Sequence, residues 1–182
     1  PSQLGTSYLN FIASHDGIGL RPAETFLTKD EVTKFINLME KNGGKVSYRS
    51  NNTDTPEPDE INITLFDAMR ESFNKDTDLN IERFVCIHTI MLSLEGVPAF
   101  YIHSLFGTKN DYGLYRKTNH NRALNRGSVK ISDMNLNKKF STESYIFNEL
   151  RRLLSIRKKQ PAFHPNAVQF LSLIHISEPT RP

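Results

Sequence analysis

The sequence predicts an α/β fold with parallel strands. Short apolar stretches typical of strands alternate along the chain with segments of helical periodicity. The uninterrupted apolar run of residues 97–102 indicates a strand covered on both faces, as strands of parallel sheets are. A second strand is expected at residues 8–14. Because two parallel strands cannot form an independent sheet, we expect the chain to be the end of a larger α/β domain whose other strands lie upstream.

Two helices are expected between these strands. The first should follow Thr28, because Thr28 and Glu31 have the spacing of a capping box, and should end at the glycines of residues 43–44. The second, over residues 80–95, is apolar nearly all round, which favours deep burial. Cys86, the one cysteine of the chain, lies in this segment and is expected to be a buried, inert thiol.

The last helix should begin with Thr142 as its N-cap and end before Pro161. Helical spacing predicts a buried stripe of Ile146, Leu150, Leu153 and Leu154. The outer face should be solvated. Its positive charges stabilise the C-terminal end of the helix through the helix dipole; they are Arg151, Arg152, Lys158 and Lys159.

Two segments are expected to be loops. Residues 45–60 are polar, contain two prolines and show little periodicity, which predicts a long surface loop of the kind that often binds ligands. Residues 108–127 predict a second loop, which is polar and basic. The tail LSLIHISEPTRP, residues 171–182, resembles translated adaptor sequence and is expected to encode no selected structure.

Composition narrows the class of protein. The chain has 182 residues, 37% hydrophobic and 24% charged, which is typical of a soluble globular domain. No apolar run approaches the roughly 20 residues that a membrane span needs. With a single cysteine and no signal-like start, we expect a cytoplasmic protein. The net charge of +3 is modest, but its concentration in RKTNHNRALNR and RRLLSIRKK keeps nucleic-acid binding open as an alternative.

The segment FIASHDGIG is the first candidate for a site. It ends an apolar stretch on His15 and Asp16, with Gly17 and Gly19 behind them. At the C-terminal end of a parallel strand, such side chains face the crevice in which α/β enzymes bind ligands. The glycines would let the backbone approach a ligand closely. From these residues alone, the alternative is a carboxylate that caps a turn beside a histidine of the core.

Charged residues form two further candidates. Arg122, Asn125 and Arg126 recur three and four apart, and guanidinium groups suit sugar hydroxyls, phosphates and carboxylates. The alternative here is a solvated basic loop. Asp59 and Glu60, taken alone, would be exposed charges. No group has the spacing of metal ligands, and neither a glycine-rich phosphate loop nor a serine nucleophile elbow is present.

Four blocks in order carry a resemblance to a known family: FIASHDGIG, INITLFDAM, GVPAFYIHSLFGTKND and YRKTNHNRALNR. Together they resemble the C-terminal part of sucrose-phosphorylase-type enzymes of the α-amylase superfamily, glycoside hydrolase family thirteen. The branch with the greatest likeness contains the glucosylglycerate and sucrose 6-phosphate phosphorylases. The resemblance covers roughly residues 5–168.

The resemblance implies a fold and a domain organisation. The chain would be the C-terminal part of a (β/α)8 TIM barrel, with the seventh and eighth strands and their helices. It would be incomplete, because a whole barrel takes about 250 residues. Residues 1–165 would belong to the catalytic barrel, 166–170 would start a truncated C-terminal β domain, and 171–182 would be the non-native tail.

The resemblance also implies a chemistry, retaining glucosyl transfer in which phosphate releases glucose 1-phosphate. Asp16 matches the carboxylate that stabilises the positive charge of the transition state. His15 and Arg122 match contacts to glucose, and Glu60 matches a region on the acceptor and phosphate side. His103 either faces the acceptor or bonds to its neighbours. The nucleophile and the acid/base would come from earlier strands, upstream of this chain.

The sequence therefore predicts part of a glucosyl-transferring phosphorylase that acts on an α-glucoside of the glucosylglycerate or sucrose-phosphate type. The expected partners are a small sugar substrate and inorganic phosphate, with no nucleic acid, membrane, metal or organic cofactor. Ser14 favours the phosphorylase branch, and glutamate rather than glutamine at position 60 argues against sucrose. Two alternatives stay open: a hydrolase or transglycosidase of the same superfamily, and a basic binding module for nucleic acid or polysaccharide. The chain alone is expected to be inactive and poorly soluble.

Overall fold

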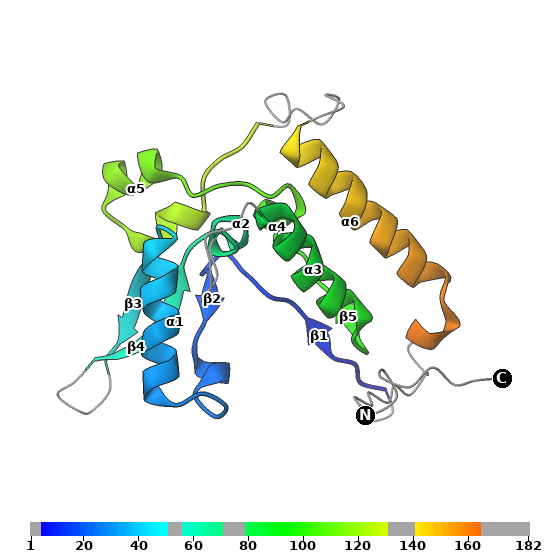
Figure 1. Cartoon of the computed structure of the whole chain (residues 1–182), viewed down its shortest axis with the longest axis horizontal. Helices are drawn as coiled ribbons and strands as arrows, with labels where there is room; N and C mark the ends of the chain where they lie inside the picture. Colours follow the sequence, from blue (N-terminus) through cyan, green and yellow to red (C-terminus); the bar gives the residue numbers. More distant parts are fainter. Residues whose placement is uncertain (1–4, 51–55, 71–78, 131–140, 165–182) are drawn as a thin grey trace.

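The structure combines a short parallel pair of strands, a small antiparallel sheet and the helices that pack on them (Figure 1). This computed structural model describes residues 5–50, 56–70, 79–130 and 141–164. The segments 166–170 and 171–182, predicted to be a β domain and a tail, lie outside the described residues. The strands are β1 (Leu9–Asn10), β2 (Ile18–Gly19), β3 (Lys45–Arg49), β4 (Glu57–Asn62) and β5 (Val97–Pro98).

Helices make up most of the remaining regular structure. The α-helices are α1 (Lys29–Lys41), α2 (Leu65–Ala68), α3 (Asn80–Ser93), α4 (Ile102–Leu105), α5 (Tyr112–Thr118) and α6 (Thr142–Lys159). Short 3-10 helices are η1 (Arg21–Ala23), η2 (Asn121–Asn125) and η4 (Pro161–Phe163). None of the helices in the described part of the chain has the length and apolar character needed to cross a bilayer.

β1 and β5 form the parallel pair that the sequence predicts, but both strands are much shorter than expected. Leu9 pairs with Val97 and Asn10 with Pro98. Within the described residues, β1 and β5 pair only with each other, and the rest of the predicted strands 8–14 and 97–102 does not extend this ladder. Val97 is more than half exposed, so the predicted cover on both faces is not seen. The α/β class is confirmed, whereas the assignment of these segments to particular barrel strands stays a prediction.

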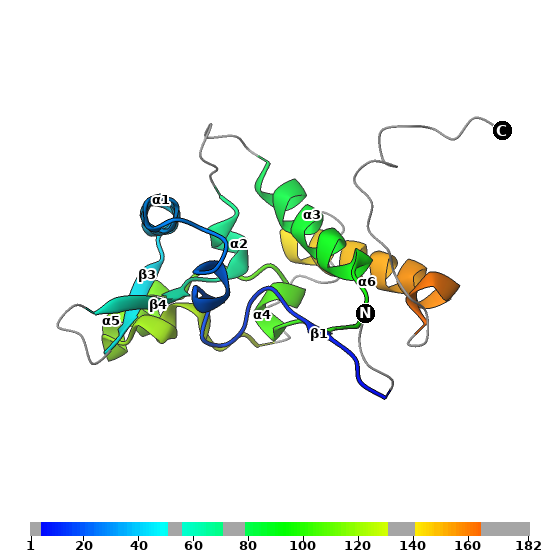
Figure 2. The same cartoon turned by 90° about the horizontal axis from the view of Figure 1, so that it is seen from below.

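The prediction of a loop over residues 45–60 is wrong, because β3 and β4 form an antiparallel pair to which β2 adds a third strand. Two prolines argued against strands here. The structure accommodates Pro58 opposite Tyr48, at a shift of register between Ser47 and Tyr48, where the regular ladder is interrupted. Helix α1 packs on this sheet through β3, and Figure 2 shows the helix end-on beside β3 and β4.

The prediction of a loop over residues 108–127 is also wrong. Asp111 caps α5 by accepting a hydrogen bond from the Leu114 amide at 2.8 Å, and Asn119 ends the helix in the left-handed conformation, with a φ of 50°. The 3-10 helix η2 follows at once. The basic segment therefore has a defined backbone, which places its arginines.

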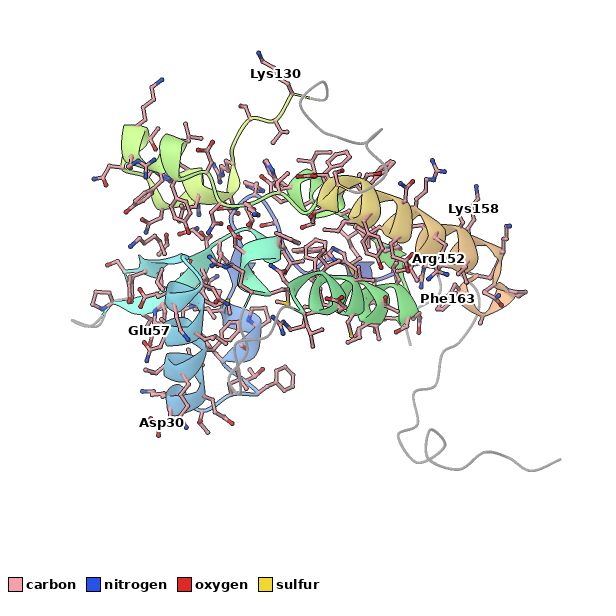
Figure 3. The ribbon with its side chains drawn as sticks, turned by 45° about the horizontal axis from the view of Figure 1, so that its top comes forward. Asp30, Glu57, Lys130, Arg152, Lys158 and Phe163 are labelled. Carbon is pink, nitrogen blue, oxygen red and sulfur yellow. The ribbon has the colours of Figure 1, made fainter. Side chains whose placement is uncertain are left out.

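The predicted ends of the first and last helices are confirmed in most respects. The capping box at α1 is complete: the Glu31 amide donates to Thr28 Oγ1 at 3.3 Å, and the Thr28 amide to Glu31 Oε2 at 2.8 Å. The N-cap of α6 is Ser141 rather than Thr142. Lys158 and Arg152 lie on the exposed face of α6, as predicted (Figure 3).

Helix α3 has the predicted bounds within two residues, but its expected deep burial is wrong. The buried side chains of α3 are Phe84, His88, Met91 and Leu92. Cys86 is exposed, which overturns the prediction of a buried thiol. Helix α6 packs along one face of α3, and among the described residues little covers the opposite face. The nearly uniform hydrophobicity of the α3 sequence predicted burial on all sides, but the described residues cover only one face of the helix.

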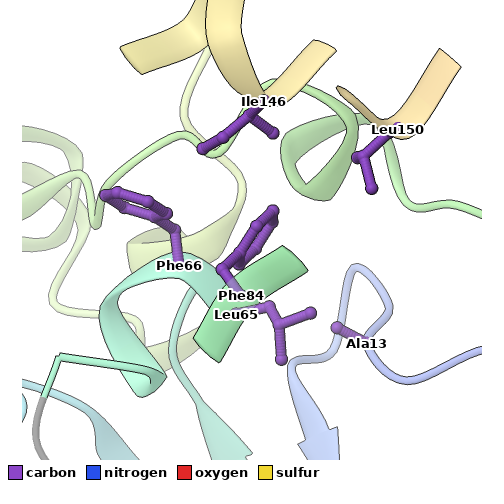
Figure 4. Close-up of a cluster of buried hydrophobic side chains, with 6 residues drawn as sticks. All are labelled: Ala13, Leu65, Phe66, Phe84, Ile146 and Leu150. Atoms are coloured by element: carbon purple, nitrogen blue, oxygen red, sulfur yellow. The ribbon is translucent and has the colours of Figure 1, made fainter. Parts of the chain in front are cut away.

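The main apolar core joins α2, α3 and α6 to the segment that follows β1. Its buried members are Ala13, Leu65, Phe66, Phe84, Ile146 and Leu150 (Figure 4). The rings of Phe66 and Phe84 meet edge to face, with their centroids 5.5 Å apart. Since Ala13 directly precedes Ser14, this core anchors the backbone that leads into His15 and Asp16.

Replacing Phe84 by alanine should destabilise the chain strongly, because this side chain is fully buried between α2, α3 and α6. We expect a loss of ~3–5 kcal/mol in the free energy of unfolding, measured by urea denaturation of the full-length protein followed by circular dichroism. Glu82→Ala on the same helix is the control, since the Glu82 side chain is charged and exposed, and should cost under about 1 kcal/mol. Equal losses for the two variants would contradict the described core.

Candidate functional site

The two candidate residues His15 and Asp16 form the tip of a tight turn. Ser14 and Gly17 pair across it, with the Ser14 amide donating to the Gly17 carbonyl at 3.0 Å and the reverse bond at 3.1 Å. Gly17 has a φ of 106°, which disfavours any other residue, and a Cβ here would lie 2.1 Å from the Ile61 carbonyl oxygen. The turn therefore lies directly against β4.

Side-chain amides from distant segments hold the carbonyl groups of this turn. Asn62 Nδ2, at the end of β4, donates to the Asp16 carbonyl at 2.7 Å, and Asn125 Nδ2, in η2, donates to the His15 carbonyl at 2.8 Å. Both asparagines are buried. The Ser47 hydroxyl donates to Asn62 Oδ1 at 2.5 Å, which turns the Asn62 amide toward the turn. The turn is thus fixed by β4 and η2 as well as by its own bonds.

The Asp16 carboxylate faces two arginines of the basic segment. Its Oδ1 atom lies 3.2 Å from Arg122 Nε and 2.9 Å from Arg126 Nη2. Its Oδ2 atom lies 3.4 Å from His15 Nε2. The Asp16 side chain is 33% exposed, so water and ligands can still reach it. This arrangement leaves Oδ2 as the more available oxygen, beside an imidazole.

Glu60 binds the same arginine and shares its Nε atom with Asp16. Arg122 Nη2 donates to Glu60 Oε1 at 2.8 Å, and Arg122 Nε donates to Oε2 at 3.1 Å. The hydrogen bonds that Arg122 donates to Glu60 are the main reason that the pKa of Arg122 is raised. Glu60 lies on β4 and its side chain is only 15% exposed, so it is not the exposed loop charge that its local sequence favoured. Arg122 therefore bridges Asp16 and Glu60.

His103 lies apart from this cluster. It is on α4 rather than at the end of a strand, and its Nδ1 atom lies 2.7 Å from Thr108 Oγ1. Burial lowers the pKa of its imidazole. His103 lines a cavity of about 570 Å³ that Asp16, Arg122 and Glu60 do not line. His103 is thus bonded to a neighbour, and its contact with the acceptor stays a prediction.

Three residues that matter for this geometry had no role assigned to them from the sequence: Arg126, Asn125 and Asn62. The spacing of Arg122, Asn125 and Arg126 was noticed, but nothing in it indicated that the last two reach the His15 carbonyl. Asn62 carries no signal in the sequence that separates it from other polar strand residues. The pairing of both arginines with carboxylates of the same chain also leaves them less available to a nucleic acid.

The cluster offers negative charge and directed hydrogen bonds. A carboxylate beside an imidazole can accept hydrogen bonds from hydroxyl groups and stabilise a positive charge that develops nearby. Within the described residues, no group of three or more histidine, cysteine, aspartate or glutamate side chains is placed to hold a metal ion.

Known proteins with similar sequences are glycoside phosphorylases. The chain is 36% identical over 163 residues to glucosylglycerate phosphorylase of Escherichia coli strain K12, a match that covers 88% of this chain and 29% of that protein. It is 38% identical over 167 residues to glucosylglycerate phosphorylase of Allomeiothermus silvanus, covering 90% of this chain and 30% of that protein. The chain thus spans about 30% of the length of these relatives. No family model matches the chain.

A solved structure shares the fold. Sucrose 6F-phosphate phosphorylase from Thermoanaerobacter thermosaccharolyticum superposes with a TM-score of 0.70 and 18% sequence identity. The superposition covers 85% of this chain and 30% of that chain. The fold described above therefore occurs within a solved phosphorylase structure.

Gly17→Ala should disrupt the turn that carries His15 and Asp16, because both its positive φ and the Ile61 carbonyl exclude a Cβ. We expect a loss of about 1–3 kcal/mol in the free energy of unfolding, measured by urea denaturation of the full-length protein. Gly19→Ala, two residues on, is the matched control, since nothing lies within 4 Å of the added Cβ. A Gly17→Ala chain as stable as the Gly19→Ala chain would show that the turn is not built as described.

Proposed function

Because the chain belongs to the family of the glucosylglycerate phosphorylases, we propose that it is part of a retaining, glucosyl-transferring phosphorylase. The proposed reaction moves a glucosyl group from an α-glucoside, of the glucosylglycerate or sucrose-phosphate type, to inorganic phosphate and yields glucose 1-phosphate. The observation that carries the proposal for the site is the Asp16 carboxylate, held on a rigid turn between Arg122, Arg126 and His15.

The chain would contribute the C-terminal part of a catalytic (β/α)8 barrel. Residues 1–165 would form the end of the barrel, with residues 8–14 and 97–102 as its seventh and eighth strands. The parallel pairing of β1 with β5 supports this arrangement. So does the exposure of apolar side chains on both segments, since Leu9 and Val97 are each more than half exposed. Residues 166–170 would then lead into a C-terminal β domain.

Asp16 would stabilise the transition state. Retaining glucosyl transfer passes through a sugar that carries positive charge near its anomeric carbon. A carboxylate that the protein already holds in place stabilises that charge without reorganising water. Since two guanidinium groups occupy Oδ1, the oxygen that would face the sugar is Oδ2, beside His15. The imidazole, 63% exposed, would hydrogen-bond the same sugar.

Arg122 and Glu60 would connect the glucose side to the acceptor side. Arg122 donates to Glu60 through its Nε and Nη2 atoms, and the same Nε atom lies within ion-pair distance of Asp16 Oδ1. This double contact uses the planar fork of an arginine, which a lysine cannot reproduce. The lone pairs that Glu60 retains could accept hydrogen bonds from hydroxyl groups of the acceptor.

Asp16→Asn in the full-length enzyme should lower kcat for phosphorolysis by about 10²–10³-fold, because the amide removes the negative charge that faces the sugar. The assay is release of glucose 1-phosphate from glucosylglycerate in the presence of phosphate. Asp30→Asn is the control, since Asp30 lies exposed in the first turn of α1 (Figure 3), and should leave kcat unchanged.

Wild-type turnover by the Asp16→Asn enzyme would contradict the role proposed for Asp16. If the unmodified enzyme releases free glucose rather than glucose 1-phosphate when phosphate is present, the reaction is hydrolysis and the proposed activity is wrong.

A further inference from the structure

A buried asparagine that the proposed reaction does not use joins two elements that carry site residues. Asn110 lies between α4 and α5 and is buried. Its backbone amide donates to Asp67 Oδ2 at 2.7 Å, and its Oδ1 atom accepts a hydrogen bond from the Thr64 amide at 2.8 Å. Thr64 is the N-cap of α2, Asp67 lies in the first turn of that helix, and both are buried. Asn110 therefore binds the start of α2 through one donated and one accepted bond.

Burial makes this pair of bonds specific for one arrangement. A buried polar group that loses its partner is unfavourable, so Asn110 has few alternative positions. Burial raises the pKa of the Asp67 carboxyl, and the hydrogen bond from the Asn110 amide acts against this shift by favouring the charged form. The Asn110 side chain also donates to the Gly43 carbonyl at 3.4 Å, just beyond the end of α1. Asn110 is thus held from two directions.

Asn110 begins the part of the chain that carries Arg122. This part, residues 110–126, contains α5 and η2. It folds back on itself, because the Asp111 amide donates to the carbonyl of the fully buried Leu124 at 2.8 Å. The end of η2 therefore lies directly beside Asn110, and Arg122 is a residue of η2. A displacement of Asn110 from α2 would move η2 with it.

The other side of this joint carries the partner of Arg122. Glu60 lies on β4, and Thr64 follows the end of β4 by two residues. Asn110 thus links the end of β4 to η2, and the Arg122–Glu60 pair, at 2.8 Å, spans the same two elements. The spacing between η2 and β4 decides whether Arg122 can contact Glu60 and Asp16 together.

We propose that Asn110 is a positioning residue that fixes η2 against β4 and so places Arg122 between Asp16 and Glu60. This inference rests on the proposed function, since Asn110 acts through Arg122. Asn121, at the start of η2, donates to a carbonyl of β3 at 3.0 Å, so loss of Asn110 would shift Arg122 and not release it. Errors of about 1 Å in the position of a group that contacts substrate can cost on the order of 10²-fold in rate.

The test compares variants of the full-length enzyme. Asn110→Ala removes the acceptor of the Thr64 amide and should lower kcat/KM for phosphorolysis of glucosylglycerate by about 10–100-fold. Asn42→Ala is the matched control, because Asn42 is also buried and its side chain donates to the Ala68 carbonyl at the end of the same short helix. Both variants should lower the melting temperature, but the control should keep kcat/KM within about threefold. An equal loss of activity in the control would show that Asn110 acts through stability alone.

Variants of Asp67 test the bond from its other end. Asp67→Asn keeps an oxygen that can accept from the Asn110 amide, and should retain kcat/KM within about threefold. Asp67→Leu removes the acceptor and should lower kcat/KM by about 10-fold or more. Equal values of kcat/KM for the two variants would contradict the proposal.

A double-mutant cycle separates positioning from a general loss of structure. In an enzyme that already carries Arg122→Ala, adding Asn110→Ala should lower kcat/KM by less than about threefold, because the group that Asn110 positions is gone. An additional loss as large as in the wild-type background would overturn the proposal, as would a wild-type kcat/KM for Asn110→Ala. If Arg122→Ala alone retains full activity, the role proposed for Arg122 fails instead, so the two failures are distinguishable.

Discussion

The candidate site depends on a turn of two residues whose carbonyl groups are bound by side chains from far along the chain. Asn62 holds the Asp16 carbonyl and Asn125 holds that of His15. Gly17 permits the close approach of the turn to β4 because it has no Cβ. Buried amides are costly unless they are bonded, so these bonds select one position for the turn. The direction of the Asp16 carboxylate follows from that position.

The elements of the fold near the site together hold the His15–Asp16 turn in this position. The core around Phe84 anchors the residues that lead into the turn, and the β3–β4 pair carries Asn62 and Glu60 to one side of it. On the other side, η2 brings Asn125 and the two arginines. Two carboxylates and two guanidinium groups then meet in one cluster, in which the opposite charges satisfy each other and still leave a carboxylate oxygen beside His15.

Local signals predicted much of the fold, and long-range contacts account for most of what was missed. The two residues of the Thr28–Glu31 capping box are close in the sequence, and so are the residues that form the apolar stripe of α6. Both features could therefore be recognised from the local sequence. The β3–β4 pair was missed because Pro58 is tolerated in it only through an irregularity of register. The family resemblance placed Asp16 and Arg122 in one site, but Arg126 acts across 110 positions of sequence, which no local pattern reveals.

The most direct measurement of the central claim is a crystal structure of the full-length enzyme with glucose bound. We predict that Asp16 Oδ2 accepts a hydrogen bond from a sugar hydroxyl while Oδ1 keeps its contacts with Arg122 and Arg126. A glucose molecule bound at a distance from Asp16, with that carboxylate contacting only the arginines and His15, would contradict the account.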